Sequence, residues 1–342
     1  MSTASRTKEE RIVSRQKIQQ RRHKHNILSL VTLLLLATAS GCNQAPQETQ
    51  TQQTQEASAP QSEQIRVVAT FLPMYWFTRA VVGDRAQVEI LVPPGSEVHD
   101  YQATPADVQA IATADVLVKN GLGMEDFLDS TIQNAGNQNL QQIDASSGIK
   151  TVGEISPVES AGDHGHSHSH GDSDGGNPHV WLDPVLAKQQ VENIRDGLVA
   201  ADPANKDAYQ ANASAYIQQL EQTHNQFQQS LQKYPNCTFI TFHDAYPYLA
   251  NRYQLQQVAV VEIPEDQPSP GDIQRAVNAV KKYDAQAIFS EPGVDNRLIQ
   301  SLSQDLNLTV YSIDPLEAGP TDPQHYFTAM SENLQTIESA CQ

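Results

Sequence analysis

Basic residues are scarce in most of this 342-residue chain, and no apolar run is long enough to cross a membrane as a helix. The first 42 residues contain eight of the 22 Lys and Arg and two of the 40 Asp and Glu, so the rest has 14 basic and 38 acidic residues. A surface this negative repels phosphate backbones and attracts cations, so nucleic acid is not an expected partner. The chain also lacks a His-Glu-x-x-His pattern and a nucleophile motif, which argues against a zinc hydrolase.

The first 42 residues have the composition of an export signal. Residues 27–39 are nearly all apolar and follow a basic stretch, but a helix needs roughly 20 residues to span a bilayer. The run ends in Ala39-Ser40-Gly41-Cys42, which resembles a bacterial lipobox. We therefore predict a lipoprotein signal peptide over residues 1–42 with lipidation of Cys42, and a plain secretory peptide is the alternative. Residues 43–64, with eight Gln and no large aliphatic residue, are predicted to be a disordered tether to the membrane.

Cysteine is rare as well, with three in the chain, and Cys237 and Cys341 are the two beyond the export signal. Export places them in an oxidising compartment, where disulfides form and persist. We therefore predict a disulfide between Cys237 and Cys341. Two buried free thiols are the alternative, because the sequence does not show whether the two Cα atoms come within bonding range.

Strand-like and helix-like segments alternate at short spacing from residue 65 onward, which predicts parallel sheets covered by helices. One helical segment, residues 203–233, is much longer than the others and has apolar residues at helical spacing. We predict an α/β fold with two lobes, residues 65–202 and 234–342, each with a central, mostly parallel sheet flanked by helices and joined by this long rigid helix. The other expected elements are strands at 65–70, 87–92, 116–120, 238–242, 257–261, 286–290 and 309–313, and helices at 74–82, 105–114, 184–200, 269–283 and 296–306.

Candidate metal ligands lie at the ends of predicted strands. His243 and Asp314 directly follow strands, His99 lies in the loop after another strand, and His179 precedes a helix. In open α/β sheets, ligands bind beyond the carboxyl ends of the strands. Three imidazoles and one carboxylate suit tetrahedral Zn²⁺, whereas Mg²⁺ and Ca²⁺ prefer oxygen ligands. We therefore predict a metal site formed by His99, His179, His243 and Asp314.

A second group of histidines alternates with Gly and Ser within the polar stretch 160–176. Tracts of this kind bind transition metals at weak, exchangeable sites. We predict a surface loop that captures zinc and passes it to the deeper site near His179, and a merely hydrophilic insertion is the alternative. The members are His164, His166, His168 and His170.

Several blocks of the chain match one protein family. The most specific block is Asn-Pro-His-Val-Trp-Leu-Asp-Pro at residues 177–184. The other blocks are residues 91–95 with His99 and Tyr101, then 114–115, 120–121, 242–246, 289–292 and 314–316. Through them, residues 65–342 resemble the zinc-binding, ZnuA-like members of the cluster 9 (cluster A-I) metal-receptor family of ABC importers. The resemblance implies two α/β lobes joined by a long helix, with metal held in the cleft by His99, His179, His243 and Asp314.

The resemblance also implies a function. It points to a periplasmic, high-affinity receptor that captures Zn²⁺ outside the inner membrane and delivers it to an ABC permease and its ATPase. Zinc is then cargo, the protein is not an enzyme, and we expect a monomer. His243 stands where manganese receptors of this family have a carboxylate, which favours zinc. A receptor for manganese or another divalent metal, and a metal-binding adhesin or storage lipoprotein on the same fold, are the alternatives.

Other carboxylates compete with Asp314 for the place in the site. Glu262 and Glu291 also follow predicted strands, and Glu97 lies two residues before His99. Some zinc members have a carboxylate where this chain has Val98, and Gln102 stands where a Glu often follows the Tyr. We expect the carboxylates of Glu291 and Asp100 to accept hydrogen bonds from the ligand imidazoles and so to fix which ring nitrogen carries the hydrogen. Zinc affinity is expected to fall below about pH 6.5, the ordinary pKa of histidine.

Overall fold

The computed structural model describes residues 64–152, 176–261, 270–283, 285, 287–292 and 297–342. The predicted signal peptide with Cys42, nearly all of the predicted tether, the four alternating histidines and Glu262 lie outside the described residues and stay predictions. None of the described helices combines the length and the apolar content needed to cross a membrane.

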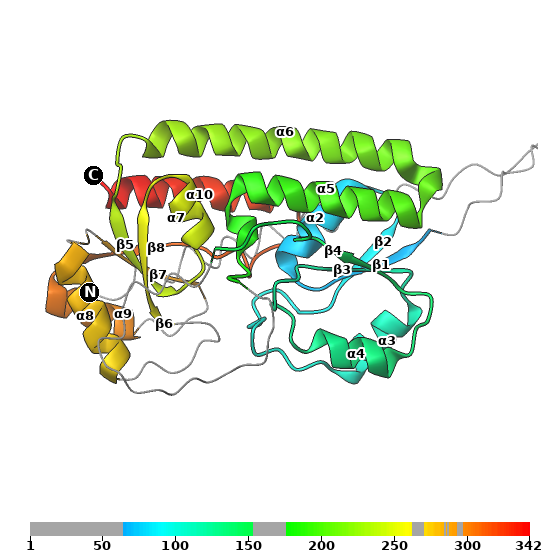
Figure 1. The fold of residues 1–342 in the computed structure, drawn as a ribbon, viewed down its shortest axis with the longest axis horizontal. Coiled ribbons are helices and arrows are strands. Elements are labelled where there is room, and N and C mark those ends of the chain that lie inside the picture. The colour runs from blue at the N-terminus through cyan, green and yellow to red at the C-terminus, as the bar shows by residue number, and fades with distance from the viewer. Residues whose placement is uncertain (1–63, 153–175, 262–269, 284, 286, 293–296) are drawn as a thin grey trace, which may run out of the picture. The chain divides into compact units, whose positions relative to one another are not determined.

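Two four-stranded sheets, both parallel, form the framework of the described residues (Figure 1). The first has the strand order β2-β1-β3-β4 and the second β6-β5-β7-β8. These sheets and their flanking helices confirm the predicted fold class. The strands are β1 (Arg66–Ala69), β2 (Gln87–Ile90), β3 (Val116–Lys119), β4 (Gln141–Asp144), β5 (Thr238–His243), β6 (Gln256–Val261), β7 (Ala287–Ser290) and β8 (Thr309–Ser312). The helices are α2 (Leu72–Val82), α3 (Pro105–Thr113), α4 (Leu128–Ala135), α5 (Pro184–Ala201), α6 (Lys206–Leu231), α7 (Pro247–Arg252), α8 (Pro270–Tyr283), α9 (Arg297–Leu306) and α10 (His325–Ala340).

Successive side chains of the inner strands pack against helices on opposite faces of each sheet, as the period of two in a strand requires. Val67 and Ala69 of β1 belong to the main core with α2 and α5, whereas Val68 packs with α3 and α4. In the second sheet, Phe239 of β5 belongs to the main core and Ile240 packs with α8 and α9. The main core therefore contains side chains of both sheets.

Helix α6 is the predicted long helix, with 26 residues that follow a 3₁₀ turn at Pro203–Asn205. It contacts α2 and α5 beside the first sheet and α10 beside the second (Figure 1). One continuous helix thus packs against elements from both parts of the chain. Its buried residues recur every three or four positions: Tyr209, Ala213, Tyr216, Leu220, Thr223, Phe227 and Leu231.

The predicted disulfide between Cys237 and Cys341 is present, with the two Cα atoms 5.8 Å apart. That separation is typical of a disulfide. Cys237 lies just before the inner strand β5, and Cys341 lies just after α10. The bond therefore ties an inner strand of the second sheet to the C-terminal helix.

Candidate metal site

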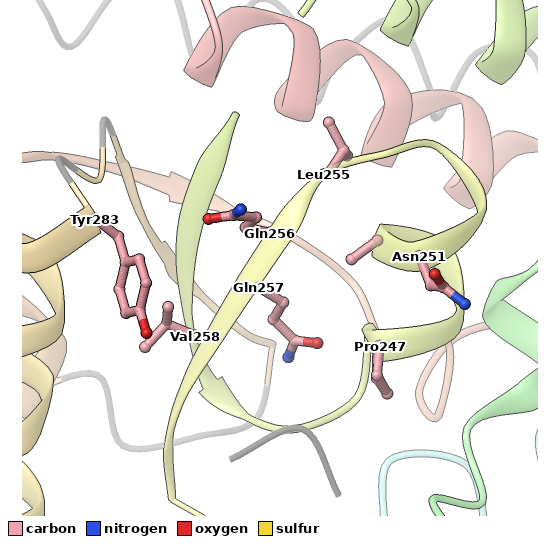
Figure 2. Close-up of a pocket in the computed structure, with 8 residues that line it drawn as sticks. Pro247, Asn251, Leu255, Gln256, Gln257, Val258 and Tyr283 are labelled. Atoms are coloured by element: carbon pink, nitrogen blue, oxygen red, sulfur yellow. The ribbon is translucent and has the colours of Figure 1, made fainter. Parts of the chain in front are cut away.

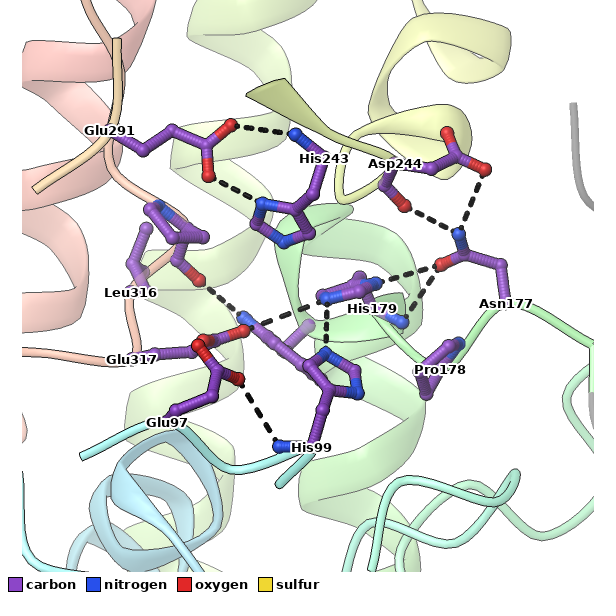
Figure 3. Close-up of polar contacts among 12 residues, drawn as sticks. Glu97, His99, Asn177, Pro178, His179, His243, Asp244, Glu291, Leu316 and Glu317 are labelled. Carbon is purple, nitrogen blue, oxygen red and sulfur yellow. Dashed lines mark hydrogen bonds and ion pairs between the residues drawn. The ribbon is translucent and has the colours of Figure 1, made fainter. Parts of the chain in front are cut away.

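Four side chains from distant parts of the sequence meet at one place: the imidazoles of His99, His179 and His243 and the carboxylate of Glu317. Each offers one ligand atom, and all of these atoms lie within 4.8 Å of one another. His99 lies in the loop after β2, His179 precedes the 3₁₀ turn at Val180–Leu182, His243 ends β5, and Glu317 lies between β8 and α10. Figure 3 shows these side chains converging.

Two short distances in the group involve His179, whose side chain is fully buried. Its Nε2 lies 3.3 Å from Nε2 of His99 and 3.6 Å from Oε1 of Glu317. The ring centroids of His179 and His243 are 5.1 Å apart. Three nitrogens and one oxygen are the number and kind of donors that tetrahedral Zn²⁺ takes in proteins. The residues present therefore fit a zinc ion.

Glu291 holds the ring of His243 from the side away from the group. Its Oε2 lies 2.5 Å from Nδ1 of His243, and its Oε1 accepts a hydrogen bond from the His243 backbone N–H at 3.4 Å (Figure 3). With Nδ1 facing the carboxylate, Nε2 is the nitrogen that can meet an ion, an arrangement common around zinc-bound histidines. Asp100, the other expected supporting carboxylate, is exposed. Glu97 is also exposed, and its Oε1 accepts a hydrogen bond from the His99 backbone N–H at 3.2 Å.

Asp314, predicted as the fourth ligand, lies outside this group, in which the carboxylate is that of Glu317. The Asp314 carboxylate accepts a hydrogen bond from the Leu316 backbone N–H at 2.7 Å and so closes a turn after β8. Its backbone is held by Asn333, whose side chain bonds both the N–H and the carbonyl of Asp314 at 2.9 and 2.7 Å. The turn brings the next acidic side chain toward the histidines, and Leu316 adopts the left-handed region within it, with φ of 68°.

The chain from Pro315 to Glu317 is held in place by residues that precede α5. Trp181 Nε1 donates a hydrogen bond to the Pro315 carbonyl at 2.8 Å, and the Gly95 backbone N–H donates to the Glu317 carbonyl at 3.2 Å. Trp181 lies two residues after His179, and Gly95 lies four residues before His99. The loops that bear three of the four candidate ligands are thus bonded to one another.

Burial keeps the imidazoles of His99 and His179 in their neutral, metal-binding form. Burial, and then the nearby His243, lower the pKa of His99 to about 3. Burial, and then His243 and His99, lower the pKa of His179 well below its ordinary value. Both rings are therefore unprotonated at neutral pH, and a metal ion need not displace protons from them.

We expect the zinc affinity to change little as the pH falls from 7.5 to 5.5, by less than about 10-fold. Two imidazoles with the ordinary pKa of about 6.5 would together lower the apparent affinity about 100-fold over this interval, because protons would compete with zinc. Since the pKa values of His99 and His179 lie below the interval, these rings stay neutral throughout it. Calorimetric titration with zinc at several pH values measures the profile, and a loss near 100-fold would show that the rings titrate normally.

A separate cavity of about 320 Å³ lies beside the edge strand β6. Figure 2 shows Tyr283 on one side of it and Pro247 and Asn251 on the other. None of the described residues that line this cavity is a histidine or a carboxylate, so these residues do not supply the donors of a metal site. The lining residues are Pro247, Ala250, Asn251, Leu255, Gln256, Gln257, Val258 and Tyr283.

Comparisons with known proteins point to one family. A family model described as "ZnuA: Zinc-uptake complex component A periplasmic" matches residues 67–340. The "High-affinity zinc uptake system protein ZnuA" of Bacillus subtilis (strain 168) is 31% identical over 292 residues, which are 84% of this chain and 91% of that protein. The "Zinc-binding lipoprotein AdcA" of Streptococcus pneumoniae (strain ATCC BAA-255 / R6) is 31% identical over 279 residues, 80% of this chain, but the chain spans only 55% of that relative.

Solved structures share the fold over most of the chain. The Zn(II)-bound ZnuA-like domain of Streptococcus pneumoniae AdcA has a TM-score of 0.66 and 29% identity, covering 82% of this chain and 99% of that one. A mutant of the laminin-binding adhesin Lmb from Streptococcus agalactiae has a TM-score of 0.71 and 29% identity, covering 81% of this chain and all of that one.

Proposed function

The chain belongs to the zinc-uptake complex component A family, and we propose that it is the receptor of an ABC importer, which captures Zn²⁺ outside the cytoplasm and delivers it to a permease powered by an ATPase. The observation that carries the proposal is the convergence of His99, His179, His243 and Glu317 at one place. Zinc is the cargo of this site. Relatives named for zinc uptake and a related domain solved with Zn(II) support the same choice of ion.

The donor set favours zinc over harder cations. Imidazole nitrogen suits Zn²⁺, whereas Mn²⁺, Mg²⁺ and Ca²⁺ are better matched by oxygen. The two negative charges of the Glu317 and Glu291 carboxylates balance the 2+ charge of the zinc ion. The three imidazoles bind it as neutral groups and add no charge. Four protein donors fill a tetrahedral ion and leave no position for the water that a zinc hydrolase needs. The proposed role is therefore binding and release.

The proposed location follows from the export signal. Lipidation of Cys42 would anchor the mature protein to the membrane, and residues 43–64 would tether the folded part within reach of a permease. The alternating histidines at 164–170 would bind zinc weakly and raise its concentration near the site.

The gene's contribution to zinc uptake tests the proposal. In a strain with no other zinc importer, deletion should abolish growth when zinc is chelated, and added zinc or the wild-type gene should restore it. Copies with His179→Ala should fail to restore growth, whereas copies with His224→Ala should succeed, because His224 lies on α6 and bonds Tyr253 instead of joining the group. Normal growth of the deletion strain under chelation would argue against uptake.

A metal-dependent adhesin is a second candidate, favoured by the similarity to the laminin-binding adhesin. In that case the purified protein should bind immobilised laminin saturably. If the protein supports zinc-limited growth and shows no saturable binding to laminin, this candidate is excluded.

A further inference from the structure

Asn177, two residues before His179, is buried with 2% exposure and joins four segments of the chain. Its side-chain oxygen accepts hydrogen bonds from the backbone N–H and from Nδ1 of His179, at 3.1 and 3.0 Å. Its side-chain nitrogen donates to the backbone carbonyl and to Oδ2 of Asp244, at 2.5 and 3.3 Å. Its backbone carbonyl accepts from the Tyr248 hydroxyl at 2.5 Å, and its backbone N–H donates to the Val152 carbonyl at 3.3 Å.

Two of these partners fix which way the amide of Asn177 points. The backbone N–H of His179 can only donate, so the atom that faces it is the amide oxygen. The backbone carbonyl of Asp244 can only accept, so the atom that faces it is the amide nitrogen. The orientation of Asn177 is therefore set by groups whose roles do not change.

The fixed amide in turn fixes the tautomer of His179. Because the Asn177 oxygen can only accept, Nδ1 of His179 must carry the hydrogen in this contact. Nε2 of His179 then has its lone pair directed at the group, where Nε2 of His99 lies 3.3 Å away (Figure 3). The opposite tautomer would place a hydrogen where the ion is expected and would lose the bond to Asn177.

The same side chain links two candidate ligands. Asp244 directly follows His243, so the bond from the Asn177 nitrogen holds the end of β5 against the segment that bears His179. We propose that Asn177 is the positioning residue of the metal site: it sets the tautomer of His179 and fixes the distance between the His179 and His243 rings. The effect of Asn177 on zinc affinity rests on the proposed zinc-binding function, whereas the tautomer of His179 is a property of the metal-free protein.

Asn120 provides a matched control. It is also fully buried, and its side-chain nitrogen donates to the Pro178 carbonyl at 3.1 Å, so it supports the same segment one residue away from His179. Its oxygen accepts from Gln190 Nε2 at 2.8 Å. Asn120→Ala therefore removes a buried amide that bonds to the same segment and leaves the bond to the His179 ring in place.

The test uses the full chain and two readouts: the imidazole ¹⁵N shifts of the metal-free protein, which report the tautomer, and zinc affinity measured by competition with a chelator. Asn177→Ala should give a mixture of His179 tautomers and a loss of about 10–100-fold in zinc affinity. Asn120→Ala should keep the wild-type tautomer. Asn177→Asp should also keep it, because a carboxylate accepts from Nδ1–H, but should weaken zinc binding because it faces Asp244 without a donor.

Wild-type tautomer and affinity in Asn177→Ala would overturn the inference. If that variant does not fold, Asn177→Asp decides: a changed tautomer, or wild-type affinity, contradicts the assigned roles. A wild-type protein that binds no zinc would end the proposed function, while the ¹⁵N comparison would still judge the role of Asn177 by itself.

Discussion

His243→Ala should lower the zinc affinity by more than about 100-fold, beyond the range seen when only a supporting residue is lost. The substitution removes one of four donors and leaves two imidazoles and one carboxylate, so that water must fill the fourth position of a tetrahedral ion. It also removes the imidazole whose Nδ1 lies 2.5 Å from the Glu291 carboxylate. Because Glu291 is only 1% exposed, its carboxylate would then stay buried without that imidazole. Competition with a chelator of known zinc affinity measures the effect.

The control for this prediction is His224→Ala. His224 is a histidine of the same chain whose Nδ1 lies 3.1 Å from the Tyr253 hydroxyl, outside the metal group. Its loss should change zinc affinity by less than about twofold, since all four donors of the group stay in place. If His243→Ala binds zinc as tightly as His224→Ala does, His243 is not a ligand.

Removing the disulfide should have the largest effect on stability and little effect on zinc binding. The bond joins residues separated by 104 positions, and losing a disulfide that closes so long a loop costs about 2–5 kcal/mol in the free energy of unfolding. Cys237 lies just before the first residue of β5, and His243 is the last residue of that strand. The six residues of β5, about 20 Å in length, therefore separate the bond from His243. Cys237→Ser with Cys341→Ser should therefore lower the midpoint of urea unfolding and keep the zinc affinity.

Reduced wild-type protein is the matched comparison for this double variant. It should unfold at the same urea concentration as the variant, because both lack the same bond. Equal midpoints for oxidised and reduced wild-type protein would mean that the bond does not stabilise the fold. A large loss of zinc affinity on reduction would mean that the site depends on the bond.

The sequence allowed the strands and helices with strong apolar patterns to be predicted, and it missed the elements without them. The strand expected at 238–242 is β5, one residue longer, and the helix expected at 203–233 is α6 with its preceding turn. Strand β4 was missed because it is an edge strand in which Ile143 alone is buried, so its residues do not alternate. Helices α4, α7 and α10 were missed as well, and tertiary packing defines the short α7 more than its sequence does.

The three histidines of the site could be predicted because each has a local signal. His243 ends a strand whose six residues are all buried, and His179 lies in the most specific sequence block. Glu317 has no such signal: it lies one residue beyond the recognised block at 314–316. Whether Asp314 or Glu317 faces the histidines is decided by the turn after β8 and by bonds from Trp181 and Gly95, which are distant in sequence.

The environment of the site also could not be read from residue types. The expectation that zinc affinity falls below about pH 6.5 used the ordinary pKa of histidine, and burial changes that value. Asn177 belonged to a recognised block, but its role depends on Asp244 and Tyr248, which only the folded chain brings to it. Residue types thus suggested three of the candidate ligands, and packing determines their protonation and orientation.

Diffraction at the zinc absorption edge from crystals grown with zinc tests the central claim most directly. We predict one strong anomalous peak within the group, bonded to Nε2 of His99, His179 and His243 and to the carboxylate of Glu317, with Asp314 still closing its turn. A map with no peak among the three histidines, or with the ion held by Asp314 while Glu317 points away, would contradict the account.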